Sequence, residues 1–585
     1  MNVKMDHATS EYPELNVVRR LLRHNCPCSE QEEYYLRQRL FQLSEELATL
    51  ETRLKQRRAK SKSDGKPSLL KQHSHLKQLE QAYKTVLSPL RYFPPEIMTI
   101  IFAMTVEPIS LDTDVGTLER AGRPSTKVAG MLTQAQSRTG PYALSQVCSS
   151  WRQLALDMPC LWNSFSIVGD GRGLSSFMDA YTATALFDYR IGRSGSLPLD
   201  VSFRSELFQG LTATNVSQAL LNRLIDHAER WRSVQLLIWS SEVVPHLHRL
   251  QRVQLLNLQE IELSLMAEGD RTLLNDIFSC APQLKRFRYQ SFLYRHNVLD
   301  FQLPWSQLID CEFYLDDAQL PVLLQRSPNL RQLAVYSTKH QTSWETPAPL
   351  THDTLERLGL FCSSLTHQVR RTTLPLMLPH LRFPRLKKLL IHGCSPKQSN
   401  GISTSDLSAS LRLCLANSQF LNLQTLTLDC FCLDMEFWEL VKAVSSTCHK
   451  ISCLRLGVSR IDNGDGMMGD WKTYLASSLI DPFLIPNKLL LPNLEELSFS
   501  FNWLEPWYDI YALSASWLVA MVRSRRDSNR QVTGIRALRK FELVLPYKFE
   551  KGNDSVKKMI PFGECRLEEL ATREFEVVVS KDSPF

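Results

Sequence analysis

The 585-residue sequence contains no apolar run that approaches the roughly 18–20 residues needed to cross a membrane. Its first residues, Met-Asn-Val-Lys-Met-Asp-His, lack the apolar core of a secretory signal. There is also little net charge, because 68 Lys and Arg stand against 61 Asp and Glu, and the acidic residues are spread along the chain. A dedicated nucleic-acid-binding protein would carry a concentrated basic face. We therefore expect a cytoplasmic or nuclear protein that binds neither membrane nor nucleic acid.

Motifs of catalysis and metal binding are missing as well. Among the 14 cysteines, the pairs Cys26/Cys28 and Cys430/Cys432 are separated by one residue, whereas zinc sites use C-x-x-C pairs. No G-x-S-x-G elbow, phosphate-binding loop or H-E-x-x-H motif occurs. The segment Gly464–Gly469 (GDGMMG) has the spacing of a dinucleotide loop, but aspartates surround it and no strand directly precedes it. The sequence thus predicts a protein that is not an enzyme and needs no metal or cofactor.

The clearest periodic signal lies near the N-terminus. Leucines separated alternately by four and three residues form a coiled-coil seam: Leu36, Leu40, Leu43, Leu47, Leu50 and Leu54. A second seam follows a polar, turn-rich connection: Leu69, Leu76, Leu79, Tyr83 and Val86. We favour an antiparallel helical hairpin over residues 30–88, with an intermolecular parallel coiled coil as the alternative. Residues 1–29 show no periodicity and are expected to be disordered.

Two apolar segments about fifty residues apart have the form of short amphipathic helices. In the first, Pro95 occupies a first-turn position where proline has no cost, and Glu96 places negative charge at the positive end of the helix dipole. Ile97, Ile100 and Ile101 then form one apolar stripe. The second segment repeats this pattern with Leu144, Val147, Trp151 and Leu154. Such small apolar helical surfaces suit docking to a partner better than chemistry.

These two segments together resemble an F-box of the fungal type. Phe93-Pro94-Pro95-Glu96-Ile97, followed by Ile101-Phe102, resembles its opening, and Val147-Cys148-x-x-Trp151-Arg152-x-Leu154-Ala155, followed by Leu161-Trp162, resembles its close. Phe93 replaces the usual leucine, and residues 103–140 form an inserted loop within a domain at 89–168. The resemblance implies that seven residues bind an adaptor: Pro94, Pro95, Ile97, Ile101, Phe102, Leu144 and Val147. It implies that Trp151, Leu154 and Trp162 pack the domain together.

A different pattern, apolar-x-x-apolar-x-apolar, repeats over residues 195–579. Its copies begin at Trp231, Leu258, Leu284, Leu308, Leu330, Leu355, Leu386, Leu423, Ile451, Leu494 and Leu538. The last two apolar residues of each copy point to one face of a short strand, and helix-like segments lie between copies. Units of this kind must stack to bury their apolar faces, so the pattern predicts a solenoid. The region resembles the irregular leucine-rich repeats that follow many F-boxes.

The residue between the two strand leucines should face the other way. We take these positions as candidates for substrate contact: Arg288, Glu312, Ala334, Thr427, Arg455, Ser498 and Glu542.

The expected fold class is α+β and multidomain, with an N-terminal helical hairpin, a small all-α F-box and an irregular α/β leucine-rich-repeat solenoid. The resemblance implies a substrate receptor of a Skp-cullin-F-box E3 ubiquitin ligase. Its F-box helices would bind a Skp-type adaptor and thereby the cullin complex, and its repeats would hold a protein substrate. The alternative is a protein-interaction scaffold outside ubiquitin ligation, built on the coiled coil and the repeats.

Overall fold

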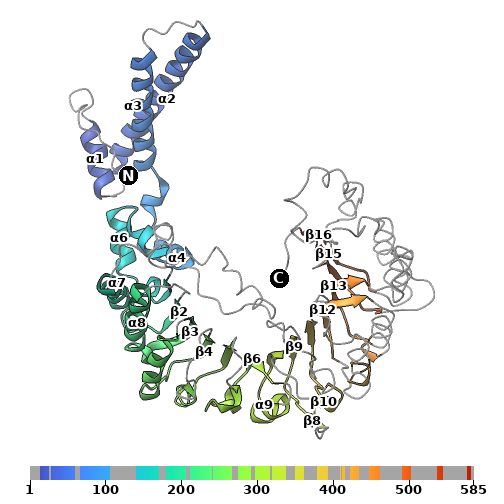
Figure 1. Ribbon diagram of the computed structural model, residues 1–585. Helices are drawn as coiled ribbons and strands as arrows, with labels where there is room; N and C mark the ends of the chain where they lie inside the picture. Colours follow the sequence, from blue (N-terminus) through green and yellow to red (C-terminus); the bar gives the residue numbers. More distant parts are fainter. Residues whose placement is uncertain are drawn as a thin grey trace. The chain divides into compact units, whose positions relative to one another are not determined.

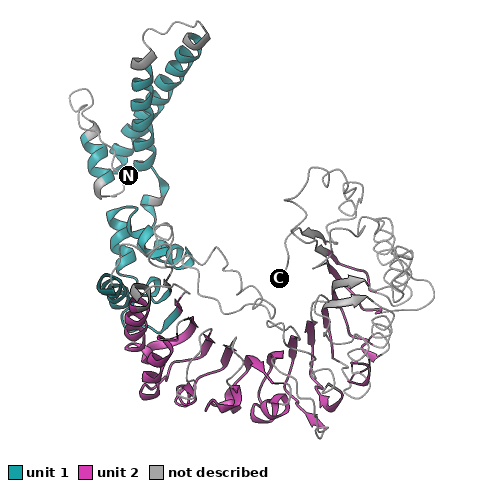
Figure 2. Cartoon of the chain, viewed as in Figure 1, with its two compact units in different colours: residues 1–109, 129–201 teal, residues 110–128, 202–585 magenta. Residues whose placement is uncertain are grey.

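The computed structural model describes the chain over the following residues: 14–24, 28–59, 66–105, 140–169, 180–205, 211–239, 241–265, 274–291, 297–316, 319–337, 349–361, 378–392, 409, 411–414, 422–433, 444, 447–461, 491–501, 536–544 and 576–580. The chain divides into two units (Figure 2). Unit 1 comprises residues 1–109 and 129–201, and unit 2 comprises residues 110–128 and 202–585. The Gly464–Gly469 segment and almost all of the predicted insertion at 103–140 lie outside the described residues.

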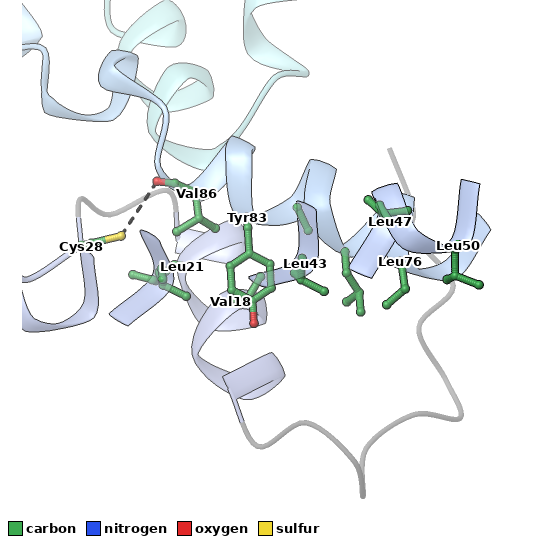
Figure 3. Packing of buried hydrophobic residues seen from close by; sticks show 12 residues of the cluster. Val18, Leu21, Cys28, Leu43, Leu47, Leu50, Leu76, Tyr83 and Val86 are labelled. Carbon is green, nitrogen blue, oxygen red and sulfur yellow. Dashed lines mark hydrogen bonds between the residues drawn. The ribbon is translucent and has the colours of Figure 1, made fainter. Parts of the chain in front are cut away.

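Unit 1 begins with a helical hairpin formed by α2 (Glu30–Ala59) and α3 (Lys66–Val86). The helices run antiparallel, since Cys28 next to α2 donates to the carbonyl of Val86 at the end of α3, while Glu51 lies 3.4 Å from His73. The predicted seams meet in one buried cluster (Figure 3), which includes Leu36, Leu43, Leu47, Leu50, Leu76, Leu79, Tyr83 and Val86. The seams therefore bury each other within one chain, as the hairpin prediction expected.

The expected disorder of residues 1–29 is wrong for α1 (Glu14–His24). Val18 and Leu21 of this helix are buried in the hairpin cluster (Figure 3). Arg91 donates to the Leu21 carbonyl at 2.7 Å, and Arg20 pairs with Glu32. The helix is too short to show a periodic signal of its own, and its stability comes from the surface on which it packs.

A compact helical module follows, formed by η1 (Pro89–Tyr92), α4 (Pro95–Thr105), α5 (Gly140–Ser145), α6 (Ser149–Leu156) and η4 (Pro159–Leu161). We call it the α4–α6 module. The second predicted helix is in fact two, because Cys148 adopts an extended conformation and its sulfur accepts a hydrogen bond from the Trp151 N–H. A residue that caps the start of one helix cannot continue another. The rest of unit 1 contains β1 (Ser164–Gly169), α7 (Ala180–Arg193) and the first part of β2 (Leu199–Ser205).

Unit 2 is built on an open parallel sheet whose strands follow one another in chain order (Figure 1). After β2 these are β3 (Trp231–Ile238), β4 (Glu260–Leu265), β5 (Arg286–Ser291), β6 (Asp310–Leu315), β7 (Gln332–Ser337), β9 (Arg357–Phe361), β11 (Lys388–His392), β12 (Thr425–Leu433), β13 (Cys453–Ile461), β14 (Glu496–Phe501), β15 (Lys540–Val544) and β16 (Glu576–Ser580). Two short strands, β8 (Leu350–Thr351) and β10 (Leu381–Arg382), pair separately.

The connections of unit 2 carry short helices. They are α8 (Leu211–Ile225), η5 (Ala228–Arg230), η6 (Val244–Arg252), η8 (Val298–Asp300), η9 (Trp305–Gln307), α9 (Leu320–Arg326) and η11 (Leu378–His380). The sheet is curved, and α8 and α9 lie on its outer side (Figure 1). A parallel strand needs a crossover connection before the next one, and these short helices lie in the described connections.

The predicted strands are confirmed one by one. The central apolar residue of each copy from β4 to β15 pairs with the next in a continuous register: Ile261, Phe287, Cys311, Leu333, Leu358, Leu389, Leu426, Leu454, Leu497 and Phe541. All of them are buried. Burial of such a side chain contributes roughly 1.5–3 kcal/mol, so this row is a main source of stability. The structure thus has mixed helix and strand, with an open parallel sheet.

Candidate functional site

One candidate surface lies on the α4–α6 module of unit 1. Exposed apolar side chains follow one side of α4 with helical spacing: Ile97 is 44% exposed, Ile100 53% and Met104 80%. Pro94 and Pro95 are exposed at the start of the helix. Val147, in the turn between α5 and α6, is 59% exposed. Large apolar side chains this open to water on a folded module are typical of an interaction site.

The opposite side of α4 anchors the module. Met98 and Phe102 are buried together with Ala155, Met158, Leu161 and Trp162. The Phe102 ring meets that of Trp151 edge-on at 5.0 Å. The Trp162 indole donates to the Ala155 carbonyl at 2.7 Å, so its polar atom is satisfied within the buried cluster. The two predicted halves, although separated by the long insertion, therefore pack against each other.

The predicted adaptor-binding residues separate into two groups. Pro94, Pro95, Ile97 and Val147 are exposed, while Ile101 and Leu144 are half-buried at the edge of the packed cluster. Phe102 is wrong as a contact residue, because it is fully buried and packs the module internally. On α4, exposed and buried apolar residues stand at adjacent positions. The sequence pattern alone does not show which of them face the partner and which face the core.

The three residues predicted to pack the domain lie in or against the buried cluster. Trp162 is fully buried, and Trp151 and Leu154 pack partly buried against the same cluster. The exposed residues Ile100 and Met104 were missed as site residues. Their signal was present, since Ile97, Ile100 and Met104 stand at i, i+3 and i+7.

A buried arginine ties the module to α7. The Arg190 guanidinium lies 5.9 Å from the rings of Tyr142 and Trp162 and 5.0 Å from that of Phe165. It donates to the Ser164 carbonyl at 2.9 Å. Burial lowers the pKa of Arg190 to about 10, which still leaves the group charged at neutral pH. Its role is to hold the aromatic side chains in place.

The second candidate surface is the face of the unit 2 sheet that does not carry the leucine core. We call it the polar face. The seven residues predicted for substrate contact lie in one register row across it. The row reads Arg288, Glu312, Ala334, Gly359, Leu390, Thr427, Arg455, Ser498 and Glu542. Their common orientation is therefore as predicted.

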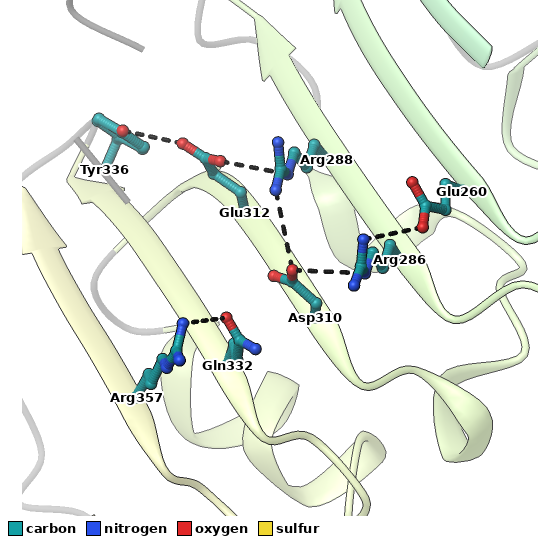
Figure 4. Close-up of polar contacts among 8 residues, drawn as sticks. All are labelled: Glu260, Arg286, Arg288, Asp310, Glu312, Gln332, Tyr336 and Arg357. Atoms are coloured by element: carbon teal, nitrogen blue, oxygen red, sulfur yellow. Dashed lines mark hydrogen bonds and ion pairs between the residues drawn. The ribbon is translucent and has the colours of Figure 1, made fainter. Parts of the chain in front are cut away.

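Charged side chains at the β4–β7 end of this face form a network (Figure 4). Arg286 donates to Glu260 at 2.9 Å and lies 3.9 Å from Asp310. Arg288 lies 3.8 Å from Asp310 and 3.6 Å from Glu312. The network holds two guanidinium groups and three carboxyl groups, so it offers no excess positive charge to a ligand.

Glu312 is the most perturbed group of this network. The Tyr336 hydroxyl donates to its carboxylate at 2.9 Å (Figure 4). Burial nevertheless raises the pKa of Glu312 to about 7, with nearby Glu262 and Asp310 adding to the rise and Arg288 opposing it. A carboxyl group that titrates near neutral pH can change the charge of this face within the physiological range.

Aromatic rings stack next to the row. Tyr314 and Tyr336 lie 4.7 Å apart and nearly parallel, and Tyr336 and Phe361 lie 4.3 Å apart. Ala334 is buried among these rings. Four of the seven candidates for substrate contact are therefore buried and not open to a partner: Arg288, Glu312, Ala334 and Ser498. Arg455 is exposed, and Thr427 and Glu542 are half-buried.

A buried pair continues this aromatic line toward β12. His392 contacts Asp429 at 2.8 Å through its Nδ1, and both side chains are buried. A Cβ atom at Gly457 would lie 1.6 Å from an Asp429 oxygen, so only glycine fits there. The register of β12 with β13 shifts between Leu428 and Phe431, next to this aspartate.

Among the described residues, no group of three or more His, Cys, Asp or Glu side chains is placed to hold a metal ion. None of the helices in the described part of the chain is long and apolar enough to cross a membrane. In comparisons with known proteins, no family model matches the chain, and no curated protein resembles it at a significant level. The two surfaces just described are therefore the features of the chain that bear on its function.

Proposed function

We propose that this chain is a substrate receptor of a Skp-cullin-F-box E3 ubiquitin ligase. In this proposal the α4–α6 module acts as an F-box that binds a Skp-type adaptor. The observation that carries it is the exposed apolar surface of Ile97, Ile100, Met104 and Val147 on a module anchored by a buried aromatic cluster. The F-box-like residue pattern falls on this module, which supports the same conclusion.

The energetics of such docking are favourable. Burial of an aliphatic side chain contributes roughly 1.5–3 kcal/mol, reduced here because each side chain is already partly covered. Several such contributions are needed to offset the cost of association. The surface is anchored from behind by Phe102 and Trp162, so little ordering is required when the partner binds.

The sheet of unit 2 would act as leucine-rich repeats that hold a protein substrate. One strand per repeat in a parallel sheet supports this assignment. The chain would then supply proximity between substrate and ligase, a large rate effect that needs no catalytic residue. We place this activity in the cytoplasm or the nucleus.

Co-purification with a recombinant Skp-type adaptor tests the proposal. Wild-type chain should bind the adaptor, and the double variant Ile97→Asp/Val147→Asp should bind about tenfold more weakly or worse, because each change puts a carboxylate into an apolar interface. Leu256→Asp is the matched control, since Leu256 is an exposed leucine in unit 2, 51% accessible, and lies outside the proposed surface.

Circular dichroism should show that both variants keep the wild-type fold, because the substituted side chains are exposed. Failure of the wild-type chain to bind any Skp-type adaptor would overturn the ligase proposal and leave a protein-interaction scaffold. Unchanged binding by the double variant would show that the adaptor uses another surface.

A further inference from the structure

A second row of the polar face, nearer the start of the strands, shows an uneven distribution of charge. It reads Ser233, Glu260, Arg286, Asp310, Gln332, Arg357, Lys388, Thr425, Cys453, Glu496, Lys540 and Glu576. Glu260, Arg286 and Asp310 alternate in sign and pair with one another. By contrast, Arg357 and Lys388 are two cations in direct register.

This placement is unfavourable for the isolated protein. Register partners on neighbouring strands lie about 4.8 Å apart, and like charges directly opposite destabilise a sheet. Lys388 is exposed, and its ammonium forms no ion pair within the described part of the chain. Arg357 is half-buried and contacts only an uncharged group in its row, the Gln332 amide oxygen at 3.4 Å. An anionic partner would relieve the repulsion.

More positive charge lies at the residues that directly precede β7 and β11, Arg331 and Lys387. The Lys387 ammonium lies 2.8 Å from the Glu356 carboxylate and pairs with it. The pKa of Glu356 is lowered chiefly by that hydrogen bond, with Lys387, Arg331 and Arg357 adding favourable charge. Three cations thus lie near this one carboxylate, and Lys387 alone pairs with it directly. Arg331 and Lys387 are exposed, so the excess charge is accessible.

We propose that Arg357 and Lys388 bind an acidic segment of a protein substrate. Carboxylates fit this site because a guanidinium and an ammonium in register on neighbouring strands can each bind one oxygen acceptor group. The inference rests on the proposed function, in which unit 2 holds the substrate. It identifies that substrate as one that presents clustered Asp or Glu side chains.

The cationic stretch of the row consists of Arg357 and Lys388 alone. This short length favours an acidic peptide over a nucleic acid as the ligand. Asp310 lies two strands before Arg357, and Glu496 lies three strands after Lys388. A phosphodiester backbone crossing the row would meet these acidic side chains on both sides. A few clustered carboxylates would occupy the cationic stretch alone.

Fluorescence anisotropy with the full chain tests the site directly. The probe is a fluorescein-labelled peptide rich in glutamate, compared with its glutamine counterpart and with a single-stranded oligonucleotide. We expect the glutamate peptide to bind, more weakly as salt rises, and the glutamine peptide not to bind. The variant Arg357→Glu/Lys388→Glu should weaken binding about tenfold or more, whereas Arg252→Glu, an exposed arginine on η6, should leave it unchanged.

A reversed-charge measurement keeps the test independent of folding. The variant Arg357→Glu/Lys388→Glu should bind a lysine-rich peptide that the wild type does not bind, and an unfolded variant would not discriminate in this way. Absence of binding to the glutamate peptide, equal binding by variant and wild type, or preference for the oligonucleotide would each overturn the inference. No adaptor is present, so failure here is distinct from failure of the proposed ligase role.

Discussion

The surroundings of Glu312 have opposing effects on the pKa of its carboxyl group. Arg288 at 3.6 Å and the hydrogen bond from Tyr336 favour its carboxylate, while burial and the nearby Glu262 and Asp310 oppose it. Burial is the largest of these effects, so the pKa of Glu312 rises to about 7. An alternating strand pattern predicts which face a residue is on, but neither its burial nor its pKa.

Glu312 should therefore make folding stability depend on pH in a particular direction. An unfolded glutamate ionises near pH 4.5, so between about pH 4.5 and about pH 7 the folded state keeps a proton that the unfolded state has released. The unfolding free energy must fall as pH rises through this window, by at most about 3 kcal/mol. Urea denaturation at pH 5 and pH 7.5 should show this loss in the wild type and a smaller one in Glu312→Gln.

Glu356→Gln is the matched control for this measurement. The pKa of Glu356 is lowered, so its effect on stability lies below pH 4.5, outside the window compared. Equal pH dependence in the wild type and Glu312→Gln would show that Glu312 ionises normally in the folded state.

Among the helices, α4 combines two functions on one short segment. Its buried stripe of Met98 and Phe102 holds the α4–α6 module together, and its exposed stripe of Ile97, Ile100 and Met104 is the proposed contact surface. The two stripes predict opposite consequences of mutation. A change in the buried stripe should unfold the module, and a change in the exposed stripe should affect binding alone.

Phe102→Ala should destabilise the α4–α6 module by about 3–5 kcal/mol, because it removes a fully buried ring that packs edge-on against Trp151. Ile100→Ala, at a side chain 53% exposed, should change stability by less than about 0.5 kcal/mol. Limited proteolysis of the full chain, with cleavage sites mapped by mass spectrometry, compares the two. Equal protection of residues 95–105 in both variants would contradict the burial assigned to Phe102.

The same helices show what could be derived from the sequence. Apolar periodicity placed α4 and the strand leucines such as Leu358 correctly, because burial of one face imposes the period. Periodicity could not show that Cys148 interrupts the second helix, since this depends on a cap formed in the folded state. It also missed α1, whose Val18 and Leu21 are buried only because the hairpin offers a surface.

At the scale of the whole molecule, unit 2 is organised along one dimension. Apart from β8 and β10, which pair separately, each strand from β3 to β15 pairs with the sheet strand before it and the sheet strand after it. Stability in such an array is approximately a sum of repeat and nearest-neighbour terms. A local defect should therefore stay local, and units 1 and 2 should respond to it separately.

Leu389→Ala tests this organisation. Leu389 is 2% exposed and pairs in register with Leu358 and Leu426, so its truncation should cost about 2–5 kcal/mol within β9, β11 and β12. Hydrogen exchange followed by mass spectrometry should show faster exchange in these three strands, with α2, α3 and the α4–α6 module unchanged. Leu256→Ala, at an exposed leucine, is the control and should leave all exchange rates unchanged. Loss of protection throughout both units would instead show that the molecule unfolds as one cooperative body, because a defect confined to one repeat would then have spread beyond its neighbours.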